Sequence, residues 1–597
     1  MQQRIFLYSI LFLFILKSTF SYSQIEITSD VAKELGATII SKKINVNKPL
    51  ILNDEGGIFV GNKGGFVISE NTTLTIDAKF LPFTNQQIFF GNGKVLFSSG
   101  SVNQIDVTWF GATPNDETSD VDAIQKAMDA AIMSTSVSVV YFPPGEYCID
   151  KPLLAMRRKS NSNLTGVKKN YSFFNLTLLG HQLPFNNPKD KKGGVSVLKV
   201  DKEIPFALGI QGARGVHIKN MVFDGYISSK MGIEDLIYKT SNELYKQDRF
   251  APLSAIVIDP FSIKKPEKGT YKGLEHLYDN KTNSTRVLIE NTVIENFPTG
   301  IAISPNGTTQ QGDSVAINHT RFYNLVHGIV ICQTQSRNIV VDNCSFHRMK
   351  FAFNSDDFGE QQGILPEVNN IKVADGVAWL FKANGNVAYG HFRNVYAEAL
   401  YGIGYSLLNK QPLNFDSCVF RFRPSEDPKK GYLNPCILKA DNALFMGCTF
   451  TIGGNPKKIR EPLLMNVKQV TYVNCYLDTN PINIGNSLTK QNSSNLIDSS
   501  FRKIKISSSN WNNGNFNESK NTNITFHKES NNFSFYSNKS YKAGDYVFGL
   551  IKLDSEPFNG TSMYSAIGRV SQVKENRIYF TSNTLEPKNG FIKLVLR

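Results

Sequence analysis

The stretch from Val107 to Leu153 reads VTWFGATPNDETSDVDAIQKAMDAAIMSTSVSVVYFPPGEYCIDKPL and decides the fold. Asp120 is the expected N-cap of a helix, because its carboxylate can accept the N–H groups of the first turn. After the helix, Val137 to Phe142 forms a short apolar run that ends at Pro143-Pro144-Gly145, which predicts a buried strand. The helix itself is predicted from apolar or small residues at 3.6-residue spacing, namely Val121, Ile124, Ala127, Met128, Ala131 and Ile132.

This stretch resembles the opening of a known protein superfamily. WFGA, then D..SD.DAIQKAMDAA, then VVYFPPGEYCID is similar to the start of pectate-lyase-superfamily proteins of the rhamnogalacturonase and epimerase type. The resemblance implies a body that is a right-handed parallel β-helix, with the helix capping its N-terminal mouth. One departure is that Asn115-Asp116-Glu117 stands where the superfamily usually has Asp-Gly. The resemblance therefore implies an architecture more strongly than a reaction.

The fold class expected for the 597 residues is all-β, a right-handed parallel β-helix solenoid with flanking β-rich parts. Short apolar runs separated by Gly, Asn and Asp predict a β-rich N-terminal lead-in. A Ser- and Asn-rich segment precedes the last apolar runs, which predict a small C-terminal β domain. The expected divisions are a signal peptide at 1–23, the lead-in at 24–105, the β-helix at 106–499 with an insertion at 226–283, a linker or last coil at 500–538, and the C-terminal domain at 539–597.

The N-terminus predicts a bacterial-type signal peptide and therefore a secreted or cell-surface protein. Arg4 precedes the apolar run from Ile5 to Ile15, which is too short for a comfortable transmembrane span. No second long apolar run follows, so we expect no transmembrane segment in the mature chain. A form that keeps the signal as an anchor is the alternative.

The net charge of +14, from 65 basic and 51 acidic residues, suits a partner that is an acidic polymer. The alternative is a solvated basic surface without a specific partner. No nucleic-acid recognition motif is present, so we expect no nucleic-acid partner.

A repeat is readable from Arg286 onward, in RVLIENTVIENFPTGIAIS and the segments that follow. Separations of 28, 24, 30 and 27 residues fall in the range of one solenoid turn, and a step of 74 allows three turns. A small or soft side chain recurs at one position, which we interpret as an inward stack at a bend; a disulfide between neighbouring coils is the alternative. This position is occupied by Met221, Thr292, Thr320, Cys344, Cys418, Cys448 and Cys475, and the preceding polar position, expected to hold the bend, by Asn220, Asn291, His319, Asn343 and Asn474.

The short strand that completes each coil is the expected wall of any groove. Period-2 alternation places Ile301, Ile329 and Phe353 inward. The outward positions of this strand, which include Ala302, Val330 and Asn354, then hold no carboxylate and no cation. Catalytic groups must therefore come from loops, with Asn354 as a candidate substrate contact.

The densest loop cluster flanks one of these strands. Asp356, Asp357 and Glu360 could supply the two carboxylates of a polysaccharide hydrolase. Lys350, Arg348 and His347 could neutralise a uronate and act as the base of a lyase, a reaction that often also uses Ca²⁺ held by carboxylates. A solvated Asp-Asp turn is the alternative.

Two further residues resemble parts of polygalacturonase-type motifs. Gly312-Asp313 is similar to GDD, although Ser314 replaces the second Asp, and His327-Gly328 is similar to GHG. On this resemblance Asp313 and His327 are candidate substrate-binding residues.

The sequence thus predicts a lyase or glycoside hydrolase acting on an acidic, uronate-containing polysaccharide. The alternative is a non-catalytic surface or glycan-binding β-helix, such as an adhesin or a tailspike-like stem. The sequence leaves the metal requirement open.

Overall fold

The protein is described here from a computed structural model that divides into two compact units, treated separately. One unit combines residues up to Thr113 with Asp122–Tyr141, and the other combines Pro114–Val121 with Phe142–Arg597. The expected signal peptide, 1–23, lies outside the described residues. The described residues are 36–82, 86–134, 136–156, 174–182, 194–228, 253–260, 284–305, 312–332, 336, 338–355, 364–383, 389–400, 402–406, 412–422, 436–452, 463–477, 482–483, 494–497, 522–527, 532–536, 546–553, 564–574, 577–581 and 590–594.

The N-terminal lead-in is itself a short stack of parallel coils. Three sheets of three parallel strands, β1-β4-β7, β2-β5-β8 and β3-β6-β9, give three coils of three strands each. Alternate side chains of β5 and β6 point into one shared core, which buries Phe66 and Ile68 from β5 and Leu74 and Ile76 from β6. The strands are β1 (Thr38–Ile40), β2 (Lys43–Val46), β3 (Leu50–Leu52), β4 (Ile58–Val60), β5 (Gly65–Ile68), β6 (Thr73–Ile76), β7 (Phe80–Pro82), β8 (Phe89–Gly91) and β9 (Lys94–Phe97).

The predicted helix forms at the expected place as α3 (Val121–Met133). Its predicted apolar stripe is buried, and the Lys126 Nζ atom donates a hydrogen bond to the Gly91 carbonyl oxygen at 2.8 Å. The carboxylate of Asp120, expected to cap the helix, accepts a hydrogen bond from the Cys148 backbone N–H at 2.9 Å. None of the described helices is both long and apolar enough to span a membrane. The elements around α3 are β10 (Ile105–Asp106), the 3₁₀ helix η1 (Val107–Phe110) and β11 (Val139–Phe142).

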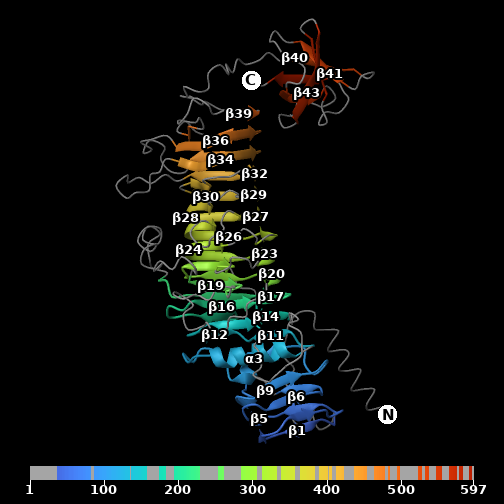
Figure 1. Cartoon of the computed structure of the whole chain (residues 1–597), viewed down its shortest axis with the longest axis vertical. Coiled ribbons are helices and arrows are strands. Elements are labelled where there is room, and N and C mark those ends of the chain that lie inside the picture. The colour runs from blue at the N-terminus through green and yellow to red at the C-terminus, as the bar shows by residue number, and fades with distance from the viewer. Residues whose placement is uncertain are drawn as a thin grey trace, which may run out of the picture. The chain divides into compact units, whose positions relative to one another are not determined.

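The second unit contains the predicted right-handed parallel β-helix, in which β12 to β39 form successive coils of one continuous parallel sheet (Figure 1). Its strands stack in three columns, and long strands turn a corner and belong to two columns. The first column holds β12 (Gly145–Cys148), β15 (Ser196–Lys199), β18 (Met221–Asp224), β21 (Val293–Glu295), the starts of β24 (Arg321–Ile331), β26 (Ser345–Ser355) and β28 (Lys372–Ala383), then β30 (Tyr396–Leu400), β33 (Val419–Phe422), β35 (Thr449–Ile452) and β37 (Tyr476–Leu477).

The second and third columns complete each coil. The second holds β13 (Leu153–Met156), β16 (Phe206–Gln211), β19 (Ser254–Ile258), β22 (Thr299–Ile303), the ends of β24, β26 and β28, β31 (Gly402–Ser406), the starts of β34 (Cys436–Met446) and β36 (Leu463–Val473), and β38 (Ile482–Asn483). The third holds β14 (Leu176–Gly180), β17 (Val216–Lys219), β20 (Thr285–Glu290), β23 (Asp313–Asn318), β25 (Ile339–Asp342), β27 (Ile364–Asn369), β29 (Tyr389–Arg393), β32 (Leu413–Asp416), the ends of β34 and β36, and β39 (Ser494–Ile497).

The predicted row of polar residues at one bend, here called the bend file, is confirmed and is longer than expected. Each residue has a left-handed backbone, and the N–H groups from Asn220 to Gly447 bond a carbonyl of the next coil, as Asn291 N does to Asn318 O at 3.2 Å. Asparagine tolerates this conformation better than most residues. The file holds Asn220, Asn291, His319, Asn343, Asn370, Asn394, Ser417, Gly447 and Asn474.

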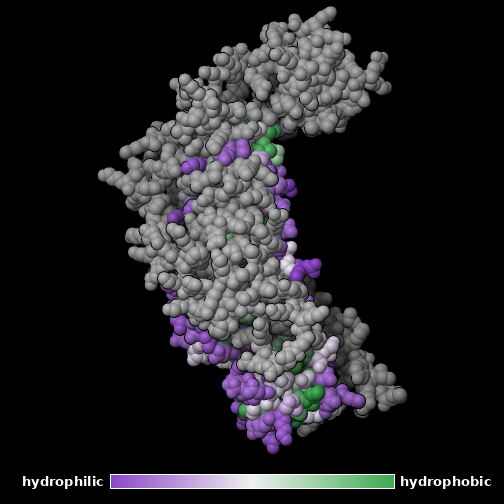
Figure 2. Space-filling model, in the orientation of Figure 1, coloured by the Kyte–Doolittle hydropathy of each residue, from purple (hydrophilic) through white to green (hydrophobic). Residues whose placement is uncertain are grey.

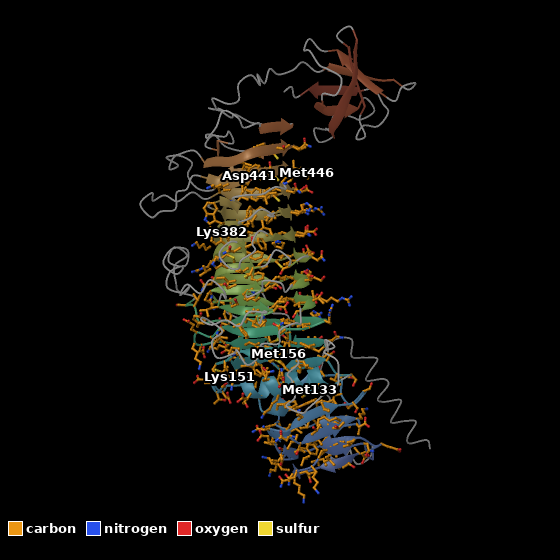
Figure 3. All side chains as sticks on the ribbon, viewed as in Figure 1. Met133, Lys151, Met156, Lys382, Asp441 and Met446 are labelled. Carbon is orange, nitrogen blue, oxygen red and sulfur yellow. The ribbon has the colours of Figure 1, made fainter. Side chains whose placement is uncertain are left out.

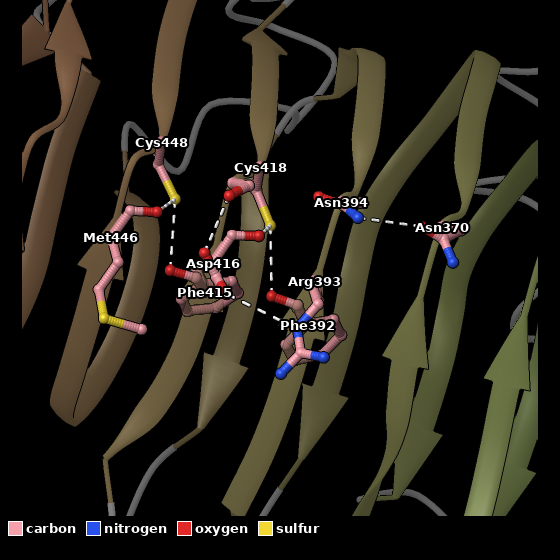
Figure 4. Close-up of polar contacts among 10 residues, drawn as sticks. Asn370, Phe392, Arg393, Asn394, Phe415, Asp416, Cys418, Met446 and Cys448 are labelled. Carbon is pink, nitrogen blue, oxygen red and sulfur yellow. Dashed lines mark hydrogen bonds and ion pairs between the residues drawn. The ribbon is translucent and has the colours of Figure 1, made fainter. Parts of the chain in front are cut away.

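The predicted inward stack of cysteines is also confirmed. Cys344, Cys418, Cys448 and Cys475 are buried free thiols, so the disulfide alternative does not apply to them. Each thiol donates to a carbonyl oxygen of the preceding coil, as Cys418 Sγ does to Phe392 O at 3.4 Å (Figure 4). Ile371 and Val395 fill the same position in the coils between 344 and 418, where backbone bonds place them.

One expectation about the solenoid is wrong in part. The interval 226–283 contains a regular coil strand, β19, which pairs with β16 and β22. This strand is apolar on each face, so it shows no alternation by which it could be recognised. The predicted outward positions Ala302 and Val330 are fully buried. The helical segment expected at 233–244 lies outside the described residues.

The predicted C-terminal β domain is a closed antiparallel barrel with strand order β40-β41-β44-β43-β42-β45. It begins at Thr522, so two of its strands come from the interval 500–538 that was expected to be a linker or last coil. Ser and Asn dominate that interval and conceal the alternation in TNITFH and NFSFY. The strands are β40 (Thr522–His527), β41 (Asn532–Tyr536), β42 (Tyr546–Leu553), β43 (Tyr564–Lys574), β44 (Arg577–Thr581) and β45 (Gly590–Leu594).

Candidate functional site

The structure tests the predicted loop cluster only in part. Asp356, Asp357 and Glu360 lie outside the described residues, and their role stays a prediction. His347 lies in the first column, where its Nδ1 atom is 2.8 Å from Asp375 Oδ2. Lys350 lies beyond the bend, with its Nζ atom 5.6 Å from the centre of the Phe351 ring.

Arg348 occupies the bend between these two residues. It has a left-handed backbone (φ 51°), and its guanidinium carbon is 5.7 Å from the centre of the Tyr323 ring. The structure therefore brings His347 and Arg348 together around Tyr323 and Asp375, and turns Lys350 toward the second column.

The residues suggested by the polygalacturonase-type motifs do not converge. Asp313 begins β23 in the third column, whereas His327 lies in the second column. His327 Nδ1 is 3.0 Å from Asn354 Nδ2, and its ring stacks on Phe351 with ring centres 5.6 Å apart. His327 and Asn354 are both buried and lie against each other.

The expectation that the outward positions of the second column carry no cation is wrong. Lys382 pairs in register with Asn354 on the second column. Lys439 occupies the same position two coils further on, and it is exposed while Leu438 and Ala440 on either side of it are buried. Figure 3 shows Lys382 on the opposite side of the stack from Met446 of the third column. The sequence patterns failed to align these strands, because β28 and β34 turn a corner without a loop or a clear motif.

The most chemically varied surface is a file of side chains in the first column, which we call the polar file. Five consecutive coils contribute one residue each, paired in register from strand to strand. The residue before each one is buried in the core, so the members of the file point away from it. The polar file consists of Lys199, Asp224, Glu295, Tyr323 and His347.

The sequence contained a signal for this file that was not used. Each member from Asp224 onward stands three residues after a position of the Cys/Thr register, at Met221, Thr292, Thr320 and Cys344. Alternation places this third residue outward again after one inward aromatic or aliphatic residue.

Two carboxylates stand next to each other in the polar file. Asp224 on β18 pairs in register with Glu295 on β21. Glu295 is only 4% exposed, whereas Asp224 is partly exposed and its Oδ1 atom accepts a hydrogen bond from Asn296 Nδ2 at 2.5 Å. Neighbouring strands lie roughly 4.8 Å apart, so the two backbones carry carboxylates in contrasting environments at close range.

Lys199 provides the positive charge at one end of the file. Its Nζ atom is 3.6 Å from Asp201 Oδ1 and 3.7 Å from Glu146 Oε2. Partial burial acts to lower the pKa of Lys199, but the carboxylates of Asp201, Glu146 and Asp224 outweigh it and raise the pKa. The lysine therefore stays protonated beside Asp224.

An aromatic and cationic surface forms the other end of the file. The guanidinium carbons of Arg321 and Arg348 lie 5.3 and 5.7 Å from the centre of the Tyr323 ring. Burial lowers the pKa of His347 from its ordinary value, an effect that its bond to Asp375 opposes and the charge of Arg321 reinforces. His347 is therefore neutral near pH 7 and able to accept a proton.

The described residues contain no group of three or more His, Cys, Asp or Glu side chains close enough to hold a metal ion.

The surface of the third column carries ion pairs between neighbouring coils. Figure 2 shows hydrophilic residues along the edge where Figure 1 labels β20 and β23 of the third column. There Glu290 Oε2 is 3.0 Å from His217 Nε2 and 3.5 Å from Lys219 Nζ. These pairs join neighbouring coils and satisfy one another's charge.

Comparisons with known proteins agree with this architecture. Residues 104–197 match the family model Rhamnogalacturonase A/epimerase, pectate lyase-like, and this range includes the stretch on which the resemblance was based. No curated protein matches the sequence significantly.

Several solved structures match the chain at low similarity. The tailspike protein of Acinetobacter phage vB_ApiP_P1 is 11% identical, with 82% of this chain and 84% of that chain covered and a TM-score of 0.33. The Streptococcus pneumoniae surface protein and adhesin PfbA is 13% identical, with coverages of 68% and 98% and a TM-score of 0.29. The catalytic domain of a GH87 alpha-1,3-glucanase is 11% identical, with coverages of 66% and 67% and a TM-score of 0.33.

The coiled parallel sheet and the family comparison support one statement. This chain is a parallel β-helix protein whose residues 104–197 match the model Rhamnogalacturonase A/epimerase, pectate lyase-like.

Proposed function

We propose that this protein hydrolyses glycosidic bonds of an extracellular polysaccharide, with Asp224 and Glu295 as its pair of carboxylates. The observation that carries the proposal is their register on consecutive coils of the polar file. Glycoside hydrolysis commonly needs two carboxyl groups about 5–10 Å apart, one as acid and one as base or nucleophile.

The contrast between the two environments supports a division of roles. Burial disfavours a charged carboxylate, and a hydrogen-bond donor favours one. We therefore assign buried Glu295 as the acid that protonates the leaving oxygen, and Asp224, which accepts from Asn296, as the carboxylate that attacks the sugar or activates water. The proton lost by Glu295 is recovered from the water that enters the product.

A lyase reaction is the second candidate, and a different part of the polar file favours it. Neutral His347 would remove the proton next to the uronate carboxylate, Tyr323 would donate a proton to the leaving oxygen, and Arg321 would neutralise the carboxylate. The bond to the leaving oxygen then breaks as a C=C bond forms, so the product absorbs ultraviolet light.

Substrate class and location rest on the family match and on the sequence. The matched family is named for rhamnogalacturonase and pectate lyase, which supports a polysaccharide as the partner. The net charge of +14 favours an acidic polymer, and the signal-like segment at 1–23 favours a secreted or cell-surface protein.

A panel of neutral and uronate-containing polysaccharides tests the proposal, with new reducing ends and ultraviolet absorbance both measured. Hydrolysis gives reducing ends without absorbance, and Asp224→Asn abolishes it while Tyr323→Phe retains most of it. Absorbance that Tyr323→Phe removes and Asp224→Asn leaves would establish the lyase instead. Silence in both channels, together with retained binding to one polymer, would support the non-catalytic glycan-binding alternative.

A further inference from the structure

A chain of amide hydrogen bonds ends on the Asp224 carboxylate. Asn324 Nδ2 donates to Asn296 Oδ1 at 2.8 Å, and Asn296 Nδ2 donates to Asp224 Oδ1 at 2.5 Å. The three residues belong to consecutive coils, so the bonds run along the axis of the stack.

The backbone fixes both asparagines in place. Asn296 and Asn324 have left-handed conformations with φ of 62° and 55°, at the bend between the first and second columns. Both side chains are buried, at 8% and 0% exposure. A buried amide held by its backbone and by a neighbouring amide loses little further freedom when it bonds a carboxylate.

The preceding coil explains why this relay ends on a carboxylate. Gly225 occupies the corresponding bend position, and its N–H group bonds the Glu295 carbonyl at 2.9 Å. A glycine offers no amide side chain for Asn296 to bond. Asn296 therefore reaches the carboxylate of Asp224, one position earlier in that coil.

The solenoid contains a second relay of the same composition, which provides an internal comparison. At the other bend, Asn394 Nδ2 donates to Asn370 Oδ1 at 3.0 Å (Figure 4), and Asn370 Nδ2 donates to Asp342 Oδ1 at 2.9 Å. This relay is exposed. The register neighbours of Asp342 are Asn318 and Asn369, so it stands beside no second carboxylate in its file.

We propose that Asn296, supported by Asn324, is a positioning residue that orients the Asp224 carboxylate for the reaction. The inference rests on the proposed function, because it gives the asparagines a role only if Asp224 reacts. Holding one carboxylate oxygen fixes the plane of the group relative to Glu295. Misplacement of a reacting group by about 1 Å can cost roughly a hundredfold in rate.

Asn296→Gly tests the proposal, with Asn370→Gly as its matched control. Glycine adopts the left-handed backbone at both positions, so each variant removes one amide side chain from one relay. We expect Asn296→Gly to lower kcat by about ten- to a hundredfold with KM within about twofold, and Asn370→Gly to leave both near wild type.

The outcomes separate this proposal from the proposed function. Equal kcat for Asn296→Gly and Asn370→Gly, in a protein whose activity Asp224→Asn abolishes, overturns the relay and leaves the hydrolase standing. Wild-type activity in Asp224→Asn, or no activity in the wild type on any polymer, overturns both. If Asn296→Gly does not fold, judged by its circular dichroism, Asn324→Gly takes its place, and a wild-type kcat for that variant overturns the relay.

Discussion

At the scale of single residues, the balance between burial and hydrogen bonding decides what each acid in the solenoid does. Asp259 shows the structural extreme. It is 1% exposed, has a left-handed backbone, and its carboxylate accepts the Ser284 N–H group at 2.9 Å. Burial raises its pKa to about 7, despite the hydrogen bonds from Ser284 that lower it. The Asp259 carboxylate holds the backbone at Ser284 in place, and we assign Asp259 no catalytic role.

Asp259 predicts a pH dependence of stability. Its folded pKa lies above the value of 3.8 for an unfolded aspartate, so its contribution is complete below about pH 4 and is lost as pH rises through about 7. Between about pH 4 and pH 7 the wild type should therefore lose roughly 1–3 kcal/mol of unfolding free energy relative to the Asp259→Asn variant. Urea unfolding at pH 4, 6 and 8 measures the difference. A difference that stays constant with pH would contradict the argument.

At the scale of elements, each coil is held by files that repeat one type of interaction. The rings of Phe392, Phe415, Phe445 and Tyr472 stack with centres 5.1, 4.7 and 5.4 Å apart, which is close to the spacing of the strands. At one bend, the left-handed residues of the bend file, such as Asn291, bond neighbouring coils through their backbone N–H groups. The next residue in several of these coils is a cysteine, such as Cys418, whose thiol is buried inside the bend. Stability at this scale comes from nearest-neighbour contacts between coils.

The left-handed bend predicts opposite effects of two substitutions at Asn291, where φ is 50°. Asn291→Ala should lower the free energy of unfolding by about 1–2 kcal/mol, because a Cβ atom without a local hydrogen bond makes this conformation costly. Asn291→Gly should be close to neutral, because glycine adopts the conformation freely. Thermal unfolding of the two variants measures the difference, and equal melting temperatures would refute the conformational explanation.

The aromatic stack predicts a larger effect. Phe445 is fully buried between Phe415 and Tyr472, so Phe445→Ala should cost about 3–5 kcal/mol, whereas Phe445→Leu should cost much less. Denaturant unfolding followed by circular dichroism measures both. A loss below about 1 kcal/mol for the alanine variant would show that this end of the solenoid does not unfold cooperatively with the rest.

The sequence predicts an element well where the fold requires one residue type at a fixed position of every coil. Cys448 and Asn343 stand at positions where a soft small group or a left-handed backbone is required, so their spacing revealed the coils. The strand β19 was missed because it is apolar on both faces and carries no such marker. The polar file was missed because Asp224 and Glu295 share no residue type with Tyr323 and His347, and only the register aligns them.

At the scale of the whole molecule, the repeated coil allows chemistry to be arranged as a line rather than a pocket. The polar file changes from Lys199 through two carboxylates to an aromatic and cationic end at Tyr323 and His347. A linear polymer can follow such a file, with its acidic groups near Arg321 and its scissile bond near Glu295. The net charge of +14 belongs to the whole chain and favours an acidic polymer over a neutral one.

This arrangement predicts that binding depends on salt. The affinity for an acidic polysaccharide should fall by about tenfold or more between 50 and 500 mM NaCl, because exposed charges attract more weakly as salt screens them. A neutral polysaccharide provides the control and should bind with little salt dependence. Titration followed by tryptophan fluorescence or calorimetry measures the affinity for each polysaccharide. A salt-independent affinity for the acidic polymer would argue against the polar file as its contact surface.

The central claim is that Asp224 and Glu295 form the reacting pair, and the rate of the Glu295→Gln variant tests it most directly. The measurement is the initial rate of reducing-end release from the best polysaccharide of the panel, compared with the wild type and with Asp342→Asn, which alters a partly exposed carboxylate of the third column. The account predicts a loss of about a hundredfold or more for Glu295→Gln and a near wild-type rate for Asp342→Asn. A Glu295→Gln variant that releases reducing ends at the wild-type rate would contradict it.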